Sequence, residues 1–119
     1  MPGCSVEREV IGTTAAYRLS GRFEGACAWD LAKRLEQEPL SEVRLDFSQV
    51  SDYVDYGIAV VASALLALQH KRVHLQGIRQ HQLRMFKYFG VDPDELAQRG
   101  VPGAPAALTE EAVAASEVA

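Results

Sequence analysis

The sequence predicts an α/β domain in which strands and helices alternate along the chain. Stretches with an apolar residue at every second position are followed by stretches with one at every third or fourth position, the periods of strands and amphipathic helices. The clearest strand is residues 43–47, and the clearest helix is the apolar stretch 58–70. A further strand pattern at 73–77 follows that helix, and this order favours a parallel pair joined by a right-handed crossover.

Length and composition predict one domain over residues 1–100. The chain has 119 residues, of which 48% are hydrophobic, enough for one core without a metal or a disulfide. The net charge of −4 argues against a nucleic-acid surface, which needs a basic face. The sequence lacks the pattern of a signal peptide and a run of eighteen apolar residues. We therefore expect a cytoplasmic protein, a monomer or weak dimer, that does not insert into a membrane.

The last residues differ in composition from the rest of the chain. Residues 101–119 are rich in Pro, Gly, Ala and Glu and contain no aromatic residue. Such a stretch has little apolar surface to bury. We predict a flexible Ala/Glu-rich tail.

The N-terminal elements are predicted as a hairpin and a helix. Residues 5–11 and 15–19 alternate on either side of a Gly-Thr-Thr turn, as the strands of an antiparallel hairpin do. Apolar residues then recur at helical spacing from Cys27 to Leu35. Trp29 is interpreted as an interior or boundary aromatic of that helix, because large aromatic residues usually fill cores. Cys4 and Cys27 lie outside any CxxC pattern and are expected to be reduced.

The C-terminal elements follow from helix start and stop signals. Asp55 stands where an N-cap belongs, with its carboxylate placed to accept the free N–H groups of the next residues. Leu83, Phe86 and Phe89 mark the apolar face of a third helix that ends near residue 90. The series Asp-Pro-Asp-Glu at 92–95 predicts a short fourth helix capped by its first acid.

No pattern of catalytic or metal-binding residues stands out. His70, His74 and His81 lie on different expected elements without the clustered ligands that a metal needs. Ser63 is expected inside the apolar helix, away from any base that would activate it. Gly-rich phosphate-binding patterns are absent from the sequence. We expect neither catalytic residues nor a metal site nor a cofactor, and the protein is predicted not to be an enzyme.

The stretch "VRLDFSQVSDYVDYGIAVVASALLAL" resembles the STAS domain, the fold of bacterial anti-sigma factor antagonists. The family pattern is a strand that ends in Asp, hydroxyl residues and Gly, followed by an apolar helix. The stretches "YRLSGRFEGACAWDLAKRLEQ", "KRVHLQGI" and "HQLRMFKYFGVD" are similar to other family elements in order and spacing. The resemblance implies an α/β STAS-like fold: a four-to-five-stranded mixed sheet with three to four helices packed mainly on one side.

The sequence departs from the family at the phosphorylation site. With Gly57 placed on the family's glycine, Tyr56 stands where the family has its phosphorylated Ser or Thr. Asp55 then stands where a second hydroxyl residue is common. No Ser or Thr lies between Asp52 and Ala62, so the phosphorylation motif is degenerate.

The resemblance implies a non-enzymatic protein-binding module that acts in a partner-switching pathway as an anti-sigma factor antagonist-like regulator. The implied partner is an anti-sigma factor that is also a serine kinase. The alternative is a small STAS subunit that binds the ABC-type ATPase of a lipid-transport system, and a third class is a domain that senses a small ligand. The predicted partner-binding residues are Arg22, Glu24, Asp52, Tyr53, Asp55, Tyr56, Gly57 and Ile58.

Two opposite roles are open for the degenerate motif. In the first hypothesis, Tyr56 and Tyr53 form a permanent aromatic contact surface. In the second, Asp55 mimics the phosphorylated state, which does not bind the partner. We favour the first, because tyrosine suits interfaces and a carboxylate carries about half the charge of a phosphate. A third interpretation is purely structural, with Tyr53 packed over the end of the sheet and Tyr56 covering the helix start.

Overall fold

The computed structural model describes residues 4–99, which form a four-stranded mixed sheet. The strands lie in the order β1-β2-β3-β4. β1 is antiparallel to β2, whereas β2, β3 and β4 are parallel to one another. The bounds are Cys4–Ile11 for β1, Thr14–Phe23 for β2, Glu42–Tyr53 for β3 and Arg72–Gln76 for β4. The predicted hairpin and the predicted parallel crossover are confirmed.

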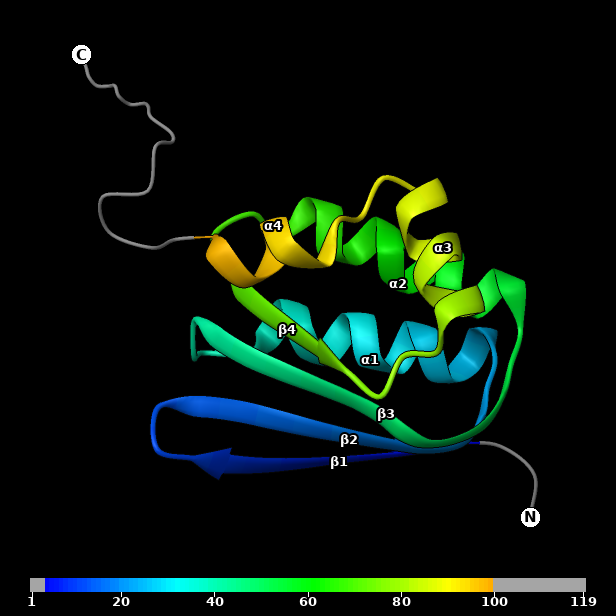
Figure 1. Cartoon of the computed structure of the whole chain (residues 1–119). Coiled ribbons are helices and arrows are strands. Elements are labelled where there is room, and N and C mark those ends of the chain that lie inside the picture. The colour runs from blue at the N-terminus through cyan, green and yellow to red at the C-terminus, as the bar shows by residue number, and fades with distance from the viewer. Residues whose placement is uncertain (1–3, 100–119) are drawn as a thin grey trace.

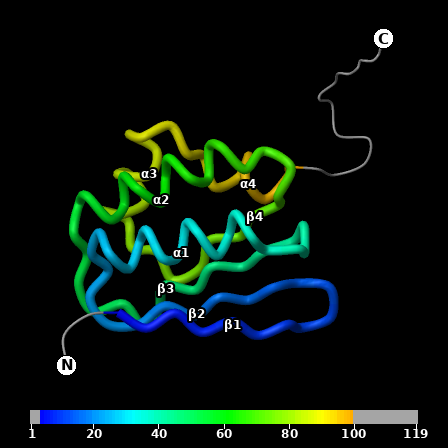
Figure 2. The backbone as a smooth tube through the Cα atoms, turned by 180° about the vertical axis from the view of Figure 1, so that it is seen from behind, coloured from blue at the N-terminus to red at the C-terminus, as the bar shows by residue number. Residues whose placement is uncertain are grey.

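The helices cover one face of this sheet. α1 (Gly25–Gln37) and α2 (Asp55–Ala67) lie side by side behind the strands in Figure 1 and in front of them in Figure 2. α4 (Pro93–Gln98) packs on β4, and α3 (Gln80–Tyr88) packs on α2. The predicted α/β sheet with helices on one side is confirmed.

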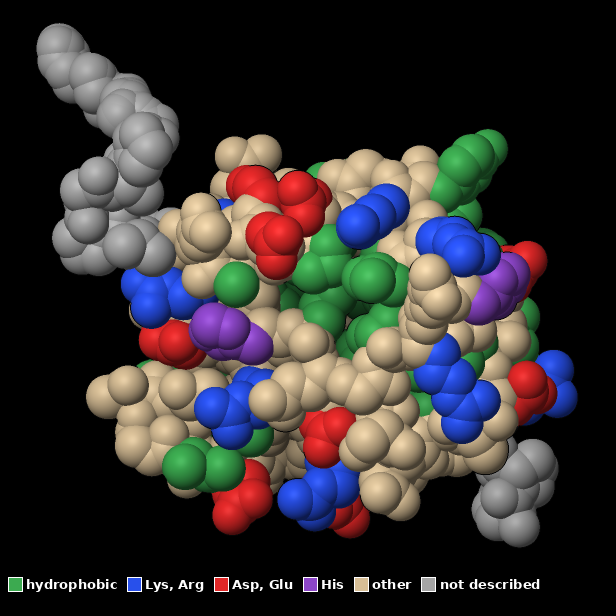
Figure 3. Space-filling view, viewed as in Figure 1, with side chains coloured by type: hydrophobic (Ala, Val, Ile, Leu, Met, Phe, Trp, Pro, Cys, Tyr) green, Lys and Arg blue, Asp and Glu red, His purple; other side chains and the backbone are tan. Residues whose placement is uncertain are grey.

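The core lies between the sheet and α1 and α2. Tyr17 and Leu19 of β2 point into it, and Arg18 between them is exposed. Val43, Leu45 and Phe47 of β3 are buried beside them. On the uncovered face, charged side chains of both signs are mixed with other side chains (Figure 3). They include Glu7, Arg18, Arg44 and Asp46.

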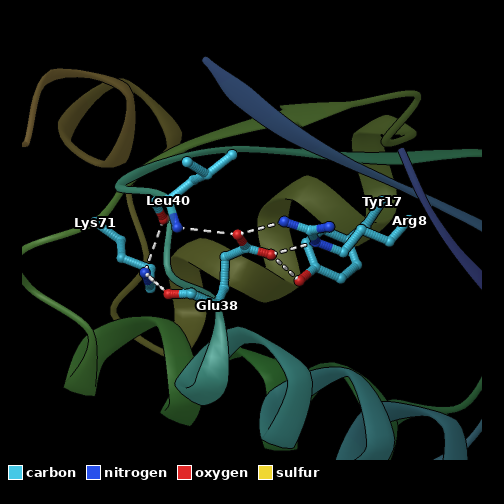
Figure 4. A network of polar contacts seen from close by, with 5 residues as sticks. All are labelled: Arg8, Tyr17, Glu38, Leu40 and Lys71. Atoms are coloured by element: carbon cyan, nitrogen blue, oxygen red, sulfur yellow. Dashed lines mark hydrogen bonds and ion pairs between the residues drawn. The ribbon is translucent and has the colours of Figure 1, made fainter. Parts of the chain in front are cut away.

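A buried polar network joins four segments beyond the C-terminal end of α1 (Figure 4). The Glu38 carboxylate accepts hydrogen bonds from Arg8 Nε (2.6 Å), from the Tyr17 hydroxyl and from the Leu40 backbone N–H (3.0 Å). Lys71 Nζ donates to the carbonyls of Glu38 (2.6 Å) and Leu40 (2.8 Å). Because the bonds of Arg8, Tyr17 and Lys71 each join different elements, the network fixes how β1, β2 and the two loops sit together.

The network changes the ionisation of its members. The hydrogen bond from Arg8 lowers the pKa of Glu38 to about 2. Burial raises the pKa of Tyr17 to about 12. Glu38 is therefore a carboxylate and Tyr17 a neutral phenol over the whole physiological range.

The prediction that Cys4 and Cys27 are thiols is wrong, because the structure joins them in a disulfide. β1 runs antiparallel to β2 and places Cys4 opposite Gly21, where α1 begins a few residues later. Lys71 is a charged residue that is nevertheless buried, on the Glu38 network.

The end of the described chain follows the sequence signals. α4 begins after Asp92, whose carboxylate accepts a hydrogen bond from the Asp94 N–H at 3.0 Å, and Pro93 is its first residue. The predicted cap is confirmed. The predicted tail, residues 101–119, lies outside the described residues. Among residues 4–99, the helices lack the length and apolar character needed to cross a bilayer.

Candidate functional site

The candidate site lies where β2 and β3 end and α1 and α2 begin. Strand pairing places Arg22 opposite Asp52 and Phe23 opposite Tyr53. The Val54 N–H then donates to the Phe23 carbonyl at 2.9 Å and ties the two strand ends together. The starts of both helices are thus held against each other at one end of the sheet.

Gly57 lets α2 approach the neighbouring chain closely. A Cβ at this position would meet the Phe23 carbonyl oxygen at 3.0 Å and the Glu24 carbonyl group at 3.2 Å. Both contacts are tighter than side chains normally make with backbone. Gly57 is therefore required for packing, whatever role it has in binding.

The start of α2 differs from the predicted cap. The helix begins at Asp55 itself, with Val54 as N-cap and no side-chain cap bond. The N–H groups of Gly57 (2.9 Å) and Ile58 (3.3 Å) donate to the Val54 carbonyl instead. The prediction that Asp55 caps the helix is wrong. Its carboxylate lies in the first turn and is exposed, where it interacts favourably with the helix dipole.

Tyr56 and Trp29 form an exposed aromatic pair on the outer face of the two helices. Each side chain is 59% exposed. A Cβ on Gly25 would meet the Tyr56 ring at 2.8 Å, so this ring lies on the backbone of the first turn of α1. Trp29 follows one turn later on the same face of α1.

The prediction that Trp29 is an interior or boundary aromatic is wrong. The buried residues of α1 are Cys27, Ala28, Leu31 and Leu35, and Trp29 points away from that stripe. The helical period already contained this signal: position 29 lies far round the helix from positions 31 and 35. For Trp29, the helical period therefore predicts exposure more accurately than the general preference of tryptophan for protein interiors does.

An open groove runs along the outer face between α1 and α2. At one end it has a volume of about 390 Å³ and is lined by both aromatic side chains, and it continues to Leu68 at the C-terminal end of α2. We call it the aromatic groove. Its lining is mostly small and apolar, with Trp29, Ala32, Tyr56, Ala59, Val60, Ser63, Ala64, Ala67 and Leu68, and the charged residues Lys33 and Glu36 of α1 line the end near Leu68.

The backbone is similar to two solved structures. One is the anti-sigma factor antagonist SpoIIAA in its unphosphorylated form, with a TM-score of 0.58 and 15% identity over 71% of this chain and 83% of that chain. The other is the STAS domain of an anti-sigma factor antagonist from Rhodobacter sphaeroides, with a TM-score of 0.52 and 20% identity over 62% of this chain and 86% of that chain. The chain has the STAS fold. No family model and no curated protein matches the sequence.

The STAS fold brings all eight predicted binding residues to the same end of the sheet, but not all reach the surface. Arg22, Asp52, Asp55 and Tyr56 are exposed, and Glu24 is half-buried. Gly57 and Ile58 are buried, so they shape this surface from below.

Tyr53 has a mainly structural place in this fold. Its ring lies 6.3 Å from the rings of Phe23 and Phe47, centroid to centroid. Burial raises the pKa of its hydroxyl. These contacts agree with the interpretation that Tyr53 packs over the end of the sheet. The exposed aromatic side chains at this end are those of Tyr56 and Trp29.

This end of the sheet presents exposed aromatic and charged side chains. Within residues 4–99 there is no group of three side chains that would hold a metal ion. Ser63 was expected inside the apolar helix, but it is exposed on α2 in the wall of the groove. It lies more than two turns beyond the helix start at Asp55, away from the N–H groups that would receive a phosphate there.

Proposed function

We propose that this chain is a protein-binding module that acts as an anti-sigma factor antagonist-like regulator, without a phosphorylation switch at the start of α2. The observation that carries the proposal is the pair Trp29 and Tyr56. Two large aromatic side chains, each 59% exposed, share one face at the helix starts. Exposed aromatic residues of this kind are the usual energetic anchors of protein interfaces.

The surface around this pair has the anatomy of an interface. Apolar lining at the centre is flanked by the exposed charges of Arg22, Asp52 and Asp55. An interface combines such an apolar centre with a polar rim. The partner class comes from the similar structures, both of which are anti-sigma factor antagonists.

The test is a calorimetric titration of the full chain with an anti-sigma factor encoded in the same genome. Tyr56→Ala and Trp29→Ala should each weaken binding by about 2 kcal/mol, roughly thirtyfold, because each removes an anchor. Both variants should melt near the wild-type temperature, because exposed side chains contribute little to folding. Tyr88→Ala is the matched control, since Tyr88 is an aromatic residue of α3 that is 85% exposed. Equal affinities for all four proteins would contradict the proposal.

A second titration separates the two roles open for Asp55. If Asp55 belongs to the contact rim, Asp55→Ala leaves affinity the same or lowers it. If Asp55 mimics a phosphorylated state, the same variant binds more tightly. We expect the first, because the exposed carboxylate carries about half the charge of a phosphate.

The absence of a switch is tested with the partner's kinase activity. Incubation with ATP should leave the start of α2 unmodified, because Tyr56 holds its hydroxyl at the end of a rigid ring. The Tyr56→Ser variant should be modified at residue 56. Phosphate on wild-type residue 56 would contradict a missing switch. A chain that binds an ABC-type ATPase and no anti-sigma factor would instead be a transporter subunit.

A further inference from the structure

The segment that contains β4 and α3 concentrates positive charge. Residues 71–91 contain five of the twelve Lys and Arg residues of the chain and no Asp or Glu. Two of these five cations donate hydrogen bonds to other segments. The other three are exposed on α3 and at its N-cap: Arg79, Arg84 and Lys87. Within residues 4–99, none of these three has an acidic side chain at ion-pair distance.

The end of α3 carries an exposed apolar patch beside these cations. Tyr88 is 85% exposed, and its ring meets the ring of Phe89 edge to face, 5.3 Å apart between centroids. Leu66 of α2 is 39% exposed and lies beside Gly90, where a Cβ would be 3.6 Å from its Cδ1 atom. Arg84 precedes Tyr88 by four residues, on the same face of the helix. We call the following side chains together the α3 surface: Leu66, Arg84, Lys87, Tyr88 and Phe89.

The α3 surface and the aromatic groove face in different directions. The groove lies on the outer side of α1 and α2, which are in front in Figure 2. α3 packs on α2 and lies behind it in that view, whereas it is in front in Figure 1. A protein bound in the groove therefore leaves the α3 surface accessible to a second one.

The charge of the α3 surface is confined to a short stretch of the molecule. α3 has nine residues and is about 13 Å long. Asp92, Asp94 and Glu95 follow at the start of α4 and are exposed, and Figure 3 shows acidic side chains gathered over α4 and basic ones over α3. A bilayer or a nucleic-acid backbone extends beyond α3 and would be repelled by those carboxylates. A short acidic segment of a protein matches the size of the basic stretch.

We propose that the α3 surface binds a short acidic segment of a protein partner, in which carboxylates lie next to a large apolar side chain. The carboxylates pair with Arg84 and Lys87, and the apolar side chain packs on Tyr88 and Leu66. This partner is a different protein from the one that binds at the aromatic groove. The chain is then an adaptor that holds two proteins at once, one on each side of α2.

The test is a fluorescence-polarisation titration of the full chain with a labelled peptide, Glu-Glu-Leu-Phe-Glu-Glu-Leu-Leu-Glu-Glu. Tyr88→Ala should raise the Kd about tenfold, because it removes an aromatic anchor. The double variant Arg84→Glu, Lys87→Glu should raise the Kd by more than this, because it places like charges opposite one another. Added salt should weaken wild-type binding, since exposed charges are screened.

Matched controls separate the α3 surface from the aromatic groove. Tyr56→Ala and Lys33→Glu change an exposed tyrosine and an exposed lysine of the groove, and both should leave the Kd for the peptide unchanged. A peptide with Gln in place of every Glu should not bind. All variants change exposed side chains, so thermal melts should show that each is folded.

Four results overturn the inference. They are a wild type that does not bind the Glu peptide, equal binding of the Gln peptide, equal affinities of Tyr88→Ala and the wild type, and sedimentation with phosphatidylserine vesicles without peptide binding. Self-association that Tyr88→Ala abolishes also overturns it, because a second copy is then the occupant. None of these measurements uses an anti-sigma factor, so they stand whether or not the proposed function holds.

Discussion

The two ends of the sheet are built in different ways. At the C-terminal end of α1, Glu38 and Lys71 are buried and hydrogen-bonded (Figure 4). The Glu38 carboxylate accepts a hydrogen bond from the Leu40 N–H, and Lys71 Nζ donates to the carbonyls of Glu38 and Leu40. At the other end, Tyr56 and Trp29 are exposed and lie on backbone and small side chains. One end uses its large polar residues to hold elements together, while the other presents its large aromatic residues to solvent. The comparison teaches that the polar network and the exposed aromatic surface are provided by separate parts of one small domain.

The binding end has a covalent connection that the network end lacks. The disulfide joins Cys4, at the start of β1, to Cys27, in the first turns of α1. The same turns carry Gly25, on which the Tyr56 ring lies. The disulfide thus fixes the segment under the aromatic pair.

The largest effect is expected from removing this disulfide. The Cys4→Ser, Cys27→Ser double variant should lose about 3 kcal/mol of unfolding free energy, because the bond closes a loop with a sequence separation of 23. Urea unfolding with and without a reductant measures the loss, and the reduced wild type serves as control because it should match the variant. Free thiols in the untreated protein, found by mass spectrometry, would contradict the pairing.

Breaking the network should have the next largest effect. Glu38→Gln should lower the unfolding free energy by about 2 kcal/mol, because Arg8 and Tyr17 lose a charged partner at a buried position. The control is Glu36→Gln, an exposed position on the same helix, which should change stability by less than about 0.5 kcal/mol. If the two variants unfold at the same urea concentration, the network does not stabilise the fold. Partner affinity should be unaffected by either variant, because the two ends are separate.

The same network predicts how stability depends on acid. The pKa of Glu38 is lowered to about 2 in the folded chain, so its contribution is complete above the unfolded pKa, near 4. That contribution is lost as the pH falls from about 5 toward 2. Urea midpoints measured across this range should fall more steeply for the wild type than for Glu38→Gln. If the urea midpoints of the wild type and Glu38→Gln fall in parallel as the pH is lowered, groups other than Glu38 cause the acid sensitivity.

The smallest effect on stability, with a clear effect on binding, is expected from Gly25→Ala. The new Cβ would meet the Tyr56 ring at 2.8 Å and must displace it, while alanine in a helix gains up to about 1 kcal/mol over glycine. The two effects oppose each other, so stability should change by less than about 1 kcal/mol and partner affinity should fall. In the Tyr56→Ala background the clash is absent, so Gly25→Ala should there be stabilising. A double-mutant cycle measures this difference, and additive effects would show that the ring does not lie on Gly25.

The sequence by itself determined the element order, which follows from local periodicity: apolar residues recur at period two in β3 and at helical period in α2. The helices on one side of the sheet, and the set of residues that lies at one end of it, came from the resemblance to the STAS family. Capping at Asp92 was equally local, since Pro93 and the acid cap act within one turn.

The tertiary structure alone decided the contacts between segments that are distant in sequence. The disulfide, the burial of Lys71 and the contact of Tyr56 with Gly25 each join elements that only the sheet order brings together. Asp55 failed as a predicted cap because the Val54 carbonyl accepts the N–H groups of Gly57 and Ile58 instead. Periodicity specifies which face of a helix or strand is buried. Which other segment of the chain packs on that face depends on the tertiary arrangement, and a local sequence pattern does not encode it.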